Sequence, residues 1–139
     1  MTITQLIEDF QSTSRLIAEI FYDKFGTTEL LLAVNSHNTI PRRGSFGIIK
    51  DYGFHGCGLY AKLPDCEIDF DFGENNRVDG FDAWRLKSFA NSKPKLYPMF
   101  DTEQKIQHEL DKLKQEGLIH KPGTFPGTSN YYWTASAKV

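Results

Sequence analysis

Residues 66–86, CEIDFDFGENNRVDGFDAWRL, decide which fold this sequence can adopt. Acidic and apolar residues alternate strictly from Glu67 to Phe72, which is the period-two pattern of a half-buried strand. A polar turn follows, and Asp79 with Asp82 then forms an acidic version of the capping box that opens a helix over about residues 80–91. A strand, a turn and a helix in one stretch predict a sheet with a helix packed against it.

The segment before this strand completes a β-hairpin. With Pro64 and Asp65 as the turn, Leu63 faces Cys66 and the pairing runs outward from there. On one side, apolar residues meet apolar residues: Ala61, Leu59 and Cys57 face Ile68, Phe70 and Phe72. On the other side, Lys62, Tyr60 and Gly58 face Glu67, Asp69 and Asp71. A slip of one residue would set acids against the apolar set, so the sequence favours this register.

The N-terminal third of the chain is predicted to be helical. Thr2 with Gln5 forms a capping box for a helix over about residues 3–24, which Gly26 ends. Thr27 or Thr28 caps a shorter helix that runs to residue 34. We expect a loop over residues 40–45, a short strand over residues 46–49 and a further strand over the glycine-rich residues 53–58. The glycines of that strand are expected where another backbone or side chain approaches closely.

The C-terminal third is predicted to hold one more helix and a small hairpin. Asp101 with Gln104 caps the helix, which Gly117 ends. Residues 118–120 and 131–134 then form the two arms of a terminal hairpin.

These elements predict an α+β fold. It has N-terminal helices, a small antiparallel sheet of three to five strands built on the central hairpin, two further helices and a C-terminal β-hairpin. We expect one domain over residues 1–139, with a helical part at 1–38, a hairpin and helix core at 46–92, and a helix and terminal hairpin at 100–139.

Composition narrows the classes of function. The 139-residue chain has a formal net charge of −2, whereas a general nucleic-acid binder normally carries an excess of Lys and Arg. No apolar run approaches the roughly 20 residues of a transmembrane helix, and no signal peptide is recognisable. Two cysteines are too few for a disulfide framework. We therefore expect a cytoplasmic protein that binds neither nucleic acid nor membrane.

The acidic strand is the main candidate for chemistry. Asp69 and Asp71, with Glu67 beside them, project from one face of a strand. Such a row could be a solvated or internally bonded face, a surface for a basic partner, or a site for Mg²⁺ or Mn²⁺. If the protein is an enzyme, His55 is its natural general base, although the register favours a structural histidine on the apolar side.

Two neighbouring residues on the helix after the strand have predicted structural roles. Trp84 is expected to anchor the helix in the core, and Arg85 to bind Asp69, Asp71 or Asp82. No nucleophile–base signature of an ordinary hydrolase occurs in the chain.

Residues 69–86, DFDFGENNRVDGFDAWRL, resemble the signature of a small uncharacterised bacterial domain family. Some members of that family are associated with polymorphic-toxin loci, in which small acidic proteins act as immunity factors. The resemblance implies a cytoplasmic protein and supplies no catalytic residues to carry over.

The leading hypothesis is an immunity protein that binds the C-terminal domain of a cognate contact-dependent or secreted toxin, such as a nuclease. It needs no cofactor. The predicted contact surface combines an acidic group that would fill a basic cleft with exposed aromatic anchors: Glu67, Asp69, Asp71 and Glu74, then Tyr60, Tyr131, Tyr132 and Trp133.

Two alternatives remain open. One is a small divalent-metal-dependent enzyme that acts on a phosphate-containing substrate through Asp69, Asp71 and His55. The other is a DNA-binding regulator that uses the last helix and terminal hairpin as a winged-helix unit, which the acidic balance of the chain disfavours.

Overall fold

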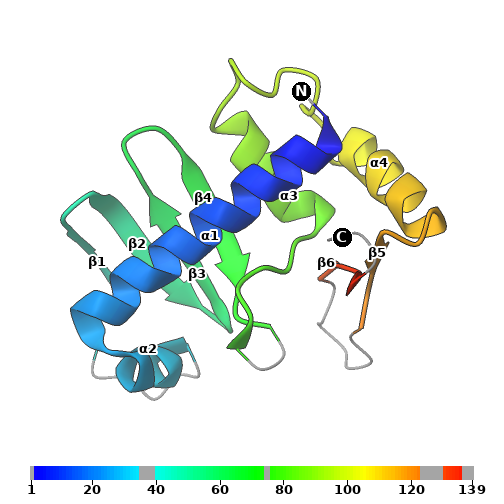
Figure 1. Cartoon of the computed structure of the whole chain (residues 1–139). Helices are drawn as coiled ribbons and strands as arrows, with labels where there is room; N and C mark the ends of the chain where they lie inside the picture. The colour runs from blue at the N-terminus through cyan, green and yellow to red at the C-terminus, as the bar shows by residue number, and fades with distance from the viewer. Residues whose placement is uncertain (1, 35–39, 74–75, 123–129, 136–139) are drawn as a thin grey trace.

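The computed structural model of the chain describes residues 2–34, 40–73, 76–122 and 130–135. It shows the predicted α+β fold, with a long N-terminal helix, a four-stranded antiparallel sheet, two further helices and a C-terminal strand pair (Figure 1). The elements in chain order are α1 Ile3–Phe25, α2 Thr27–Val34, β1 Arg43–Phe46, β2 Ile49–His55, β3 Gly58–Lys62, β4 Glu67–Asp71, α3 Ala83–Asn91, α4 Glu103–Gln115, β5 Ile119–His120 and β6 Tyr132–Trp133.

Helix α1 is the element that joins the two halves of the molecule. It begins with the predicted capping box of Thr2 and Gln5 and ends at Gly26, whose φ of 88° suits glycine. Toward its C-terminus the Phe21 ring lies 5.1 Å from the ring of Tyr52 in the sheet, and nearer its N-terminus the Phe10 ring lies 5.6 Å from that of Phe89 in α3. Figure 1 shows α1 crossing one face of the sheet. Helices α3 and α4 and the β5–β6 pair lie on the side of the sheet where β4 forms the edge.

The sheet has the order β1-β2-β3-β4, and the predicted register of the central hairpin is confirmed. Leu59 pairs with Phe70, Tyr60 with Asp69 and Lys62 with Glu67. The pairing closes as predicted at the turn, because the Leu63 N–H donates to the Cys66 carbonyl at 2.8 Å. The apolar residues of the hairpin face α1, so the acidic ones lie on the opposite face.

The predictions for residues 40–58 are partly wrong. Phe46 ends β1 and Ile49 begins β2, so the predicted strand over residues 46–49 is the turn of a hairpin, with Gly47 at a φ of 53°. Gly56, with a φ of 54°, lies in the turn between β2 and β3, so residues 53–58 are not one strand. The predicted close approach to a glycine is confirmed at Gly58, where an added Cβ would lie 3.0 Å from the imidazole of His55.

Helix α3 covers the edge strand β4. The Ser92 hydroxyl oxygen accepts the backbone N–H of Glu67 at 3.0 Å and lies 3.2 Å from the carbonyl oxygen of the same residue. Exposed backbone groups at the edge of a sheet are open to pairing with another chain. Ser92 therefore blocks one position on this edge and fixes the helix against the sheet.

The helix caps differ in detail from the prediction. Helix α3 begins at Ala83 with Asp82 as its N-cap, later than the predicted start near residue 80. Helix α4 is capped by Thr102, whose side chain accepts the Lys105 N–H, whereas Asp101 binds the Lys105 ammonium. Gly117 follows the end of α4 with a φ of 76°, as predicted.

The C-terminal hairpin is present as the β5–β6 pair, in which Ile119 pairs with Trp133 and His120 with Tyr132. A single bridge between Phe81 and Tyr131 joins this pair to the segment before α3. No helix within the described ranges combines the length and apolarity that crossing a membrane requires.

Candidate functional site

The sheet face opposite α1, here called the outer face, carries the predicted acidic row. Across β2, β3 and β4 its residues align in three rows: Asp51, Lys62 and Glu67; then Gly53, Tyr60 and Asp69; then His55, Gly58 and Asp71. Asp51, Lys62 and His55 are exposed, so much of this face is open to solvent. The three acids of β4, however, have three different environments.

Asp69 is the buried member of the row, with only 9% of its surface exposed. Its Oδ2 lies 2.6 Å from His55 Nε2, and its Oδ1 accepts the Arg85 Nε–H at 3.2 Å. Both carboxylate oxygens are therefore occupied. Of the readings left open for the acidic row, Asp69 therefore fits the internally bonded one, because Arg85 of α3 binds it.

Arg85 joins two carboxylates from different elements. Besides Asp69 it binds Asp82, whose Oδ2 accepts from Arg85 Nη1 at 2.8 Å while Oδ1 accepts the Arg85 backbone N–H. Burial alone would lower the pKa of Arg85, but Asp82 and Asp69 outweigh it and hold that pKa above its ordinary value. The predicted link between Arg85 and the acids is confirmed for Asp69 and Asp82, and it fixes α3 to the hairpin.

His55 lies on the polar outer face, not on the apolar side as the register was expected to place it. Its side chain is 49% exposed. The ring reaches diagonally over Gly58, where any Cβ would crowd it, to bind Asp69. A histidine oriented by a carboxylate is an arrangement that can hold or move a proton.

Tyr60 lies at the centre of the outer face, between Gly53 and Asp69 in neighbouring strands. Burial raises its pKa, and the charges of Glu67 and Asp51 raise it further, so the hydroxyl lies in a negative environment. Beside it is a hollow of about 300 Å³, here called the Gly53 hollow, whose lining includes Arg43, Asp51, Gly53, His55, Tyr60 and Asp69.

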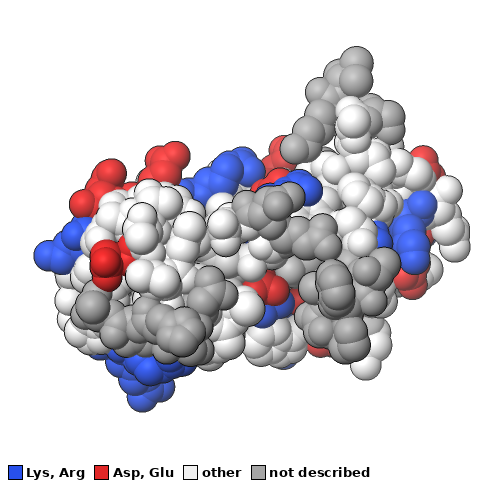
Figure 2. All heavy atoms as spheres, turned by 90° about the horizontal axis from the view of Figure 1, so that it is seen from below, with Lys and Arg blue, Asp and Glu red and all other residues white. Residues whose placement is uncertain are grey.

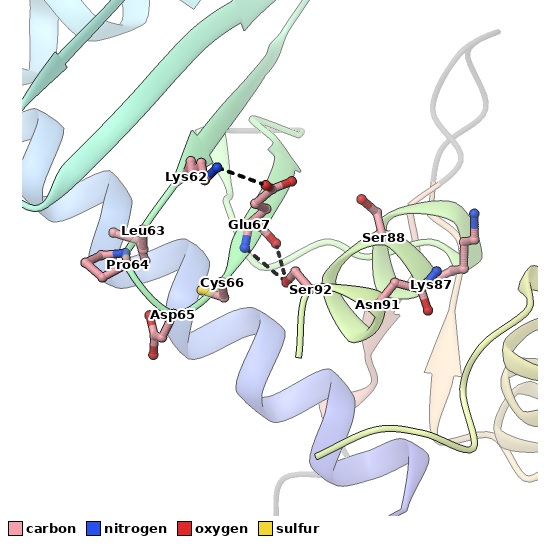
Figure 3. A pocket seen from close by; sticks show the side chains of 10 residues that line it. All are labelled: Lys62, Leu63, Pro64, Asp65, Cys66, Glu67, Lys87, Ser88, Asn91 and Ser92. Atoms are coloured by element: carbon pink, nitrogen blue, oxygen red, sulfur yellow. Dashed lines mark hydrogen bonds and ion pairs between the residues drawn. The ribbon is translucent and has the colours of Figure 1, made fainter. Parts of the chain in front are cut away.

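A larger groove of about 490 Å³ lies between the tip of the β3–β4 hairpin and α3 (Figure 3). Lys62, Asp65 and Glu67 come from the hairpin, and Lys87, Ser88 and Asn91 from the helix. Figure 3 shows Ser92 bonded to Glu67 between the two elements. Its charged lining is balanced in sign, so the groove favours neither a cation nor an anion. Cys66 at its base is buried, which raises the pKa of its thiol to about 11 and keeps it protonated.

The remaining acids of the predicted surface are less prominent. Glu67 is half-exposed and lies 3.8 Å from the Lys62 ammonium. Asp71 accepts a hydrogen bond from the Asn130 amide at 3.1 Å. Glu74 lies outside the described residues.

Most of the predicted aromatic anchors are internal. Tyr131 and Tyr132 are each 3% exposed, so the expectation that they are exposed anchors is wrong. Trp133 is partly buried, and its Nε1–H donates to the buried Gln11 of α1 at 3.0 Å. Gln11 in turn donates to the Asp79 carbonyl, and this polar link fixes the terminal strand pair to the helix. Nothing in the periodicity of α1 marks Gln11 for this role.

Trp84 was predicted to be a core anchor, and this prediction is wrong, because the side chain is 51% exposed. The buried side of α3 consists of Ala83, Leu86, Phe89 and Ala90. Trp84 precedes Leu86 by two positions, about 200° around a helix, so it lies on the opposite side.

Charges on the surface are mixed. Figure 2 shows basic and acidic side chains interspersed on the face that it presents, with one group of basic side chains near an edge. Among the described residues, no group of three or more His, Cys, Asp or Glu side chains is arranged to hold a metal ion. Asp69, Asp71 and His55 therefore do not converge as a metal site.

Comparison with known proteins gives one match. A family model described as a domain of unknown function (DUF6896) matches residues 3–133, which is nearly the whole chain. No curated protein and no solved structure matches it.

Proposed function

The chain belongs to the DUF6896 family, and we propose that it is a cytoplasmic immunity protein that binds and neutralises a cognate bacterial toxin domain through the outer face of its sheet. The observation that carries the proposal is the position of Tyr60. It lies half-buried at the centre of an open sheet face, beside a hollow, and the charges of two nearby carboxylates, Asp51 and Glu67, act on its hydroxyl. Tyrosines in such settings are frequent anchors of protein–protein interfaces.

The contact surface differs from the one expected from the sequence. Tyr60 and Glu67 remain in it, and Asp51 joins them from β2. Asp69 lies beneath the surface as part of its support, because both of its oxygens are already bonded. Tyr131 and Tyr132 belong to the interior.

The resemblance of residues 69–86 to a family signature associated with toxin loci supports the same class of function. A protein that neutralises a toxin with a basic cleft needs accessible negative charge and an anchor, and the Asp51–Tyr60–Glu67 group offers both. Association through these charges should be faster at low ionic strength than at high ionic strength.

The test begins with a pull-down of the tagged full chain from its native lysate at low and high salt, with mass spectrometry of the recovered proteins. A recovered toxin-like domain is then expressed in a heterologous host with and without the immunity candidate. We expect growth to be restored by the wild-type chain, restored less by Tyr60→Ala, and fully restored by Glu116→Gln, a control at an exposed acid after α4. A recovered domain that stays fully toxic beside the wild-type chain would contradict the proposal.

A second candidate function is favoured by one contact, the 2.6 Å approach of His55 Nε2 to Asp69 Oδ2. A carboxylate that orients a half-exposed histidine is the arrangement of a general base, so a small enzyme acting on a phosphate-containing substrate is the alternative. Calorimetric titration with Mg²⁺ and Mn²⁺, and a phosphoesterase screen of wild type against His55→Ala, test it. Equal turnover by the two chains would eliminate it.

A further inference from the structure

The Gly53 hollow is a gap in the outer face with a definite local cause. Gly53 aligns with Arg43 on β1 and Tyr60 on β3, so a position between two large side chains carries no side chain at all. Glycine inside a strand weakens it, and often marks a place where a ligand or another chain approaches.

Backbone geometry does not require this glycine. Gly53 has no left-handed φ, and a Cβ added to it would meet its nearest atom, the Arg42 carbonyl oxygen, at 3.8 Å, which is ordinary contact. The contrast with Gly58 is direct, since a Cβ there would lie 3.0 Å from the His55 ring. Gly58 is thus explained by packing within the protein, whereas at Gly53 a Cβ would make only ordinary contacts, with the Arg42 carbonyl oxygen and, at 4.0 Å, with Arg43 Cγ, so packing does not require a glycine there.

The charge on the lining of the hollow that can attract a cation is that of Asp51. Asp51 is exposed and has no ion pair within 4.0 Å among the described residues. Burial is the largest cause of the raised pKa of the Tyr60 hydroxyl, and the charges of Glu67, Asp51 and Asp69 raise that pKa further. Arg85 of α3 compensates the negative charge of Asp69. In the neighbouring row, Lys62 lies between Asp51 and Glu67. Arg43 lies on the β1 side of the rim, and of the described residues that line the hollow it alone is a Lys or Arg.

We propose that the Gly53 hollow receives an arginine side chain of the partner protein, with its guanidinium against the Tyr60 ring and paired with Asp51. Arginine suits the site better than lysine, because a planar guanidinium stacks on an aromatic ring and can bind one carboxylate through two N–H groups. A hollow of about 300 Å³ has room for such a side chain. The inference rests on the proposed function, in that it names the group of the partner that the outer face recognises.

The site can be tested without any partner. The probe is Nα-acetyl-arginine methylamide, added to the ¹⁵N-labelled full chain and followed by ¹H–¹⁵N correlation spectra at low salt. The neutral probe Nα-acetyl-citrulline methylamide has nearly the same shape and is the matched ligand control. We expect millimolar binding of the arginine probe with shifts at the amides of β2 and β3, and a response to citrulline weaker by about fivefold or more.

Two substitutions, one that removes a negative charge and one that removes a positive charge, test whether the hollow binds a cation or an anion. Asp51→Asn should weaken binding of the arginine probe about threefold, and Arg43→Gln should strengthen it by a similar factor, because it removes a like charge from the rim. Asp23→Asn is the control, since Asp23 is an exposed aspartate on α1 that also has no ion pair among the described residues. The reverse pattern, with weaker binding in Arg43→Gln and stronger binding in Asp51→Asn, would show that the hollow takes an anion and overturn the proposal.

A third substitution tests the space itself. Gly53→Val fills the hollow and should reduce binding about fivefold or more, with folding checked by circular dichroism. If this variant does not fold, Tyr60→Leu removes the ring and serves in its place. Arginine binding that is unchanged in Gly53→Val, or in Tyr60→Leu where Gly53→Val does not fold, would refute the site. Amide shifts with the arginine probe that equal those with the citrulline probe would refute it as well.

The outcomes separate this inference from the proposed function. A toxin that is neutralised and binds the wild type, Asp51→Asn and Gly53→Val chains equally well would leave the immunity function standing and reject the arginine site. Arginine-specific binding at the hollow, combined with a recovered domain that stays toxic beside the wild-type chain, would support the arginine site and reject the immunity function.

Discussion

Asp69→Asn should destabilise the protein far more than Glu67→Gln, although both changes remove one negative charge from the same strand. Asp69 is 9% exposed and contacts Arg85 at 3.2 Å and His55 at 2.6 Å. Glu67 lies 3.8 Å from the Lys62 ammonium, both side chains are about half exposed, and its other side-chain contact is with the Tyr60 hydroxyl at the surface. The pair of substitutions therefore compares a charge held inside the fold with a charge left at its surface.

The expected magnitudes follow from these contacts. Hydrogen bonds to charged groups contribute about 1.5–3 kcal/mol and neutral ones about 1 kcal/mol, so neutralising the acceptor of two bonds should cost about 2 kcal/mol. The cost stays below the 3–5 kcal/mol or so of an isolated buried charge, because Asp82 still binds Arg85. Glu67→Gln should change the free energy of unfolding by about 0.5 kcal/mol or less.

The assay is urea unfolding of the wild type and both variants, followed by circular dichroism. A shift in the midpoint at constant slope reports a change in stability rather than in compactness. If Asp69→Asn and Glu67→Gln differ by less than about 0.5 kcal/mol, Asp69 is not held as described. A double-mutant cycle of Asp69→Asn with Arg85→Lys adds a second check. The two should couple by at least about 0.5 kcal/mol, because a lysine cannot bridge two carboxylates as Arg85 does.

Three further changes test other parts of the structure. Gly58→Ala should cost about 1–3 kcal/mol in the free energy of unfolding, because the new methyl group would lie 3.0 Å from an imidazole and 3.2 Å from a carbonyl oxygen; Gly53→Ala should be neutral or slightly stabilising, and equal effects would contradict the packing. Ellman's reagent at pH 8 should label exposed Cys57 well before buried Cys66, since a thiol pKa raised to about 11 leaves about 100-fold less thiolate than the ordinary value of 9.0; equal rates would show that Cys66 is accessible. Tyr97→Phe should cost about 1.5 kcal/mol in urea unfolding, because it removes a 2.6 Å bond to the Asp9 carboxylate on α1. Burial and that bond also raise the pKa of Tyr97, so in an alkaline titration its phenol should ionise at a higher pH than an exposed tyrosine.

The parts of the fold that could be predicted are those in which neighbours in sequence set the structure. The register of the central hairpin follows from strict alternation and the position of the turn, because a slip of one residue would exchange the two faces. The capping box of α1 depends on residues three positions apart. Strand β1 gave no such signal: its residues, RGSF, lack an apolar alternation, as is common in an edge strand.

The parts of the site that could not be predicted depend on distant residues. The link between Arg85 and Asp69 was predicted, but the second contact of Asp69 was not, because it depends on His55 crossing over Gly58, where a Cβ would lie 3.0 Å from the ring. The position of Trp84 was predictable in principle, because the stripe formed by Leu86 and Phe89 places it on the far side of α3. The internal position of Tyr131 depends on its bridge to Phe81, which no short-range pattern indicates.

The acids of β4 therefore should not be treated as one functional group in mutational work. Charge reversal at Asp69 would leave Arg85 and His55 beside a cation, so lost binding in that variant would report damage to the fold and not the loss of a contact. Asp51 and Glu67 are free of this ambiguity, because both lie at the surface in the row next to Tyr60, Asp51 exposed and Glu67 half-exposed. A binding defect that appears in Asp51→Asn and Glu67→Gln at unchanged stability is the result that assigns recognition to the outer face.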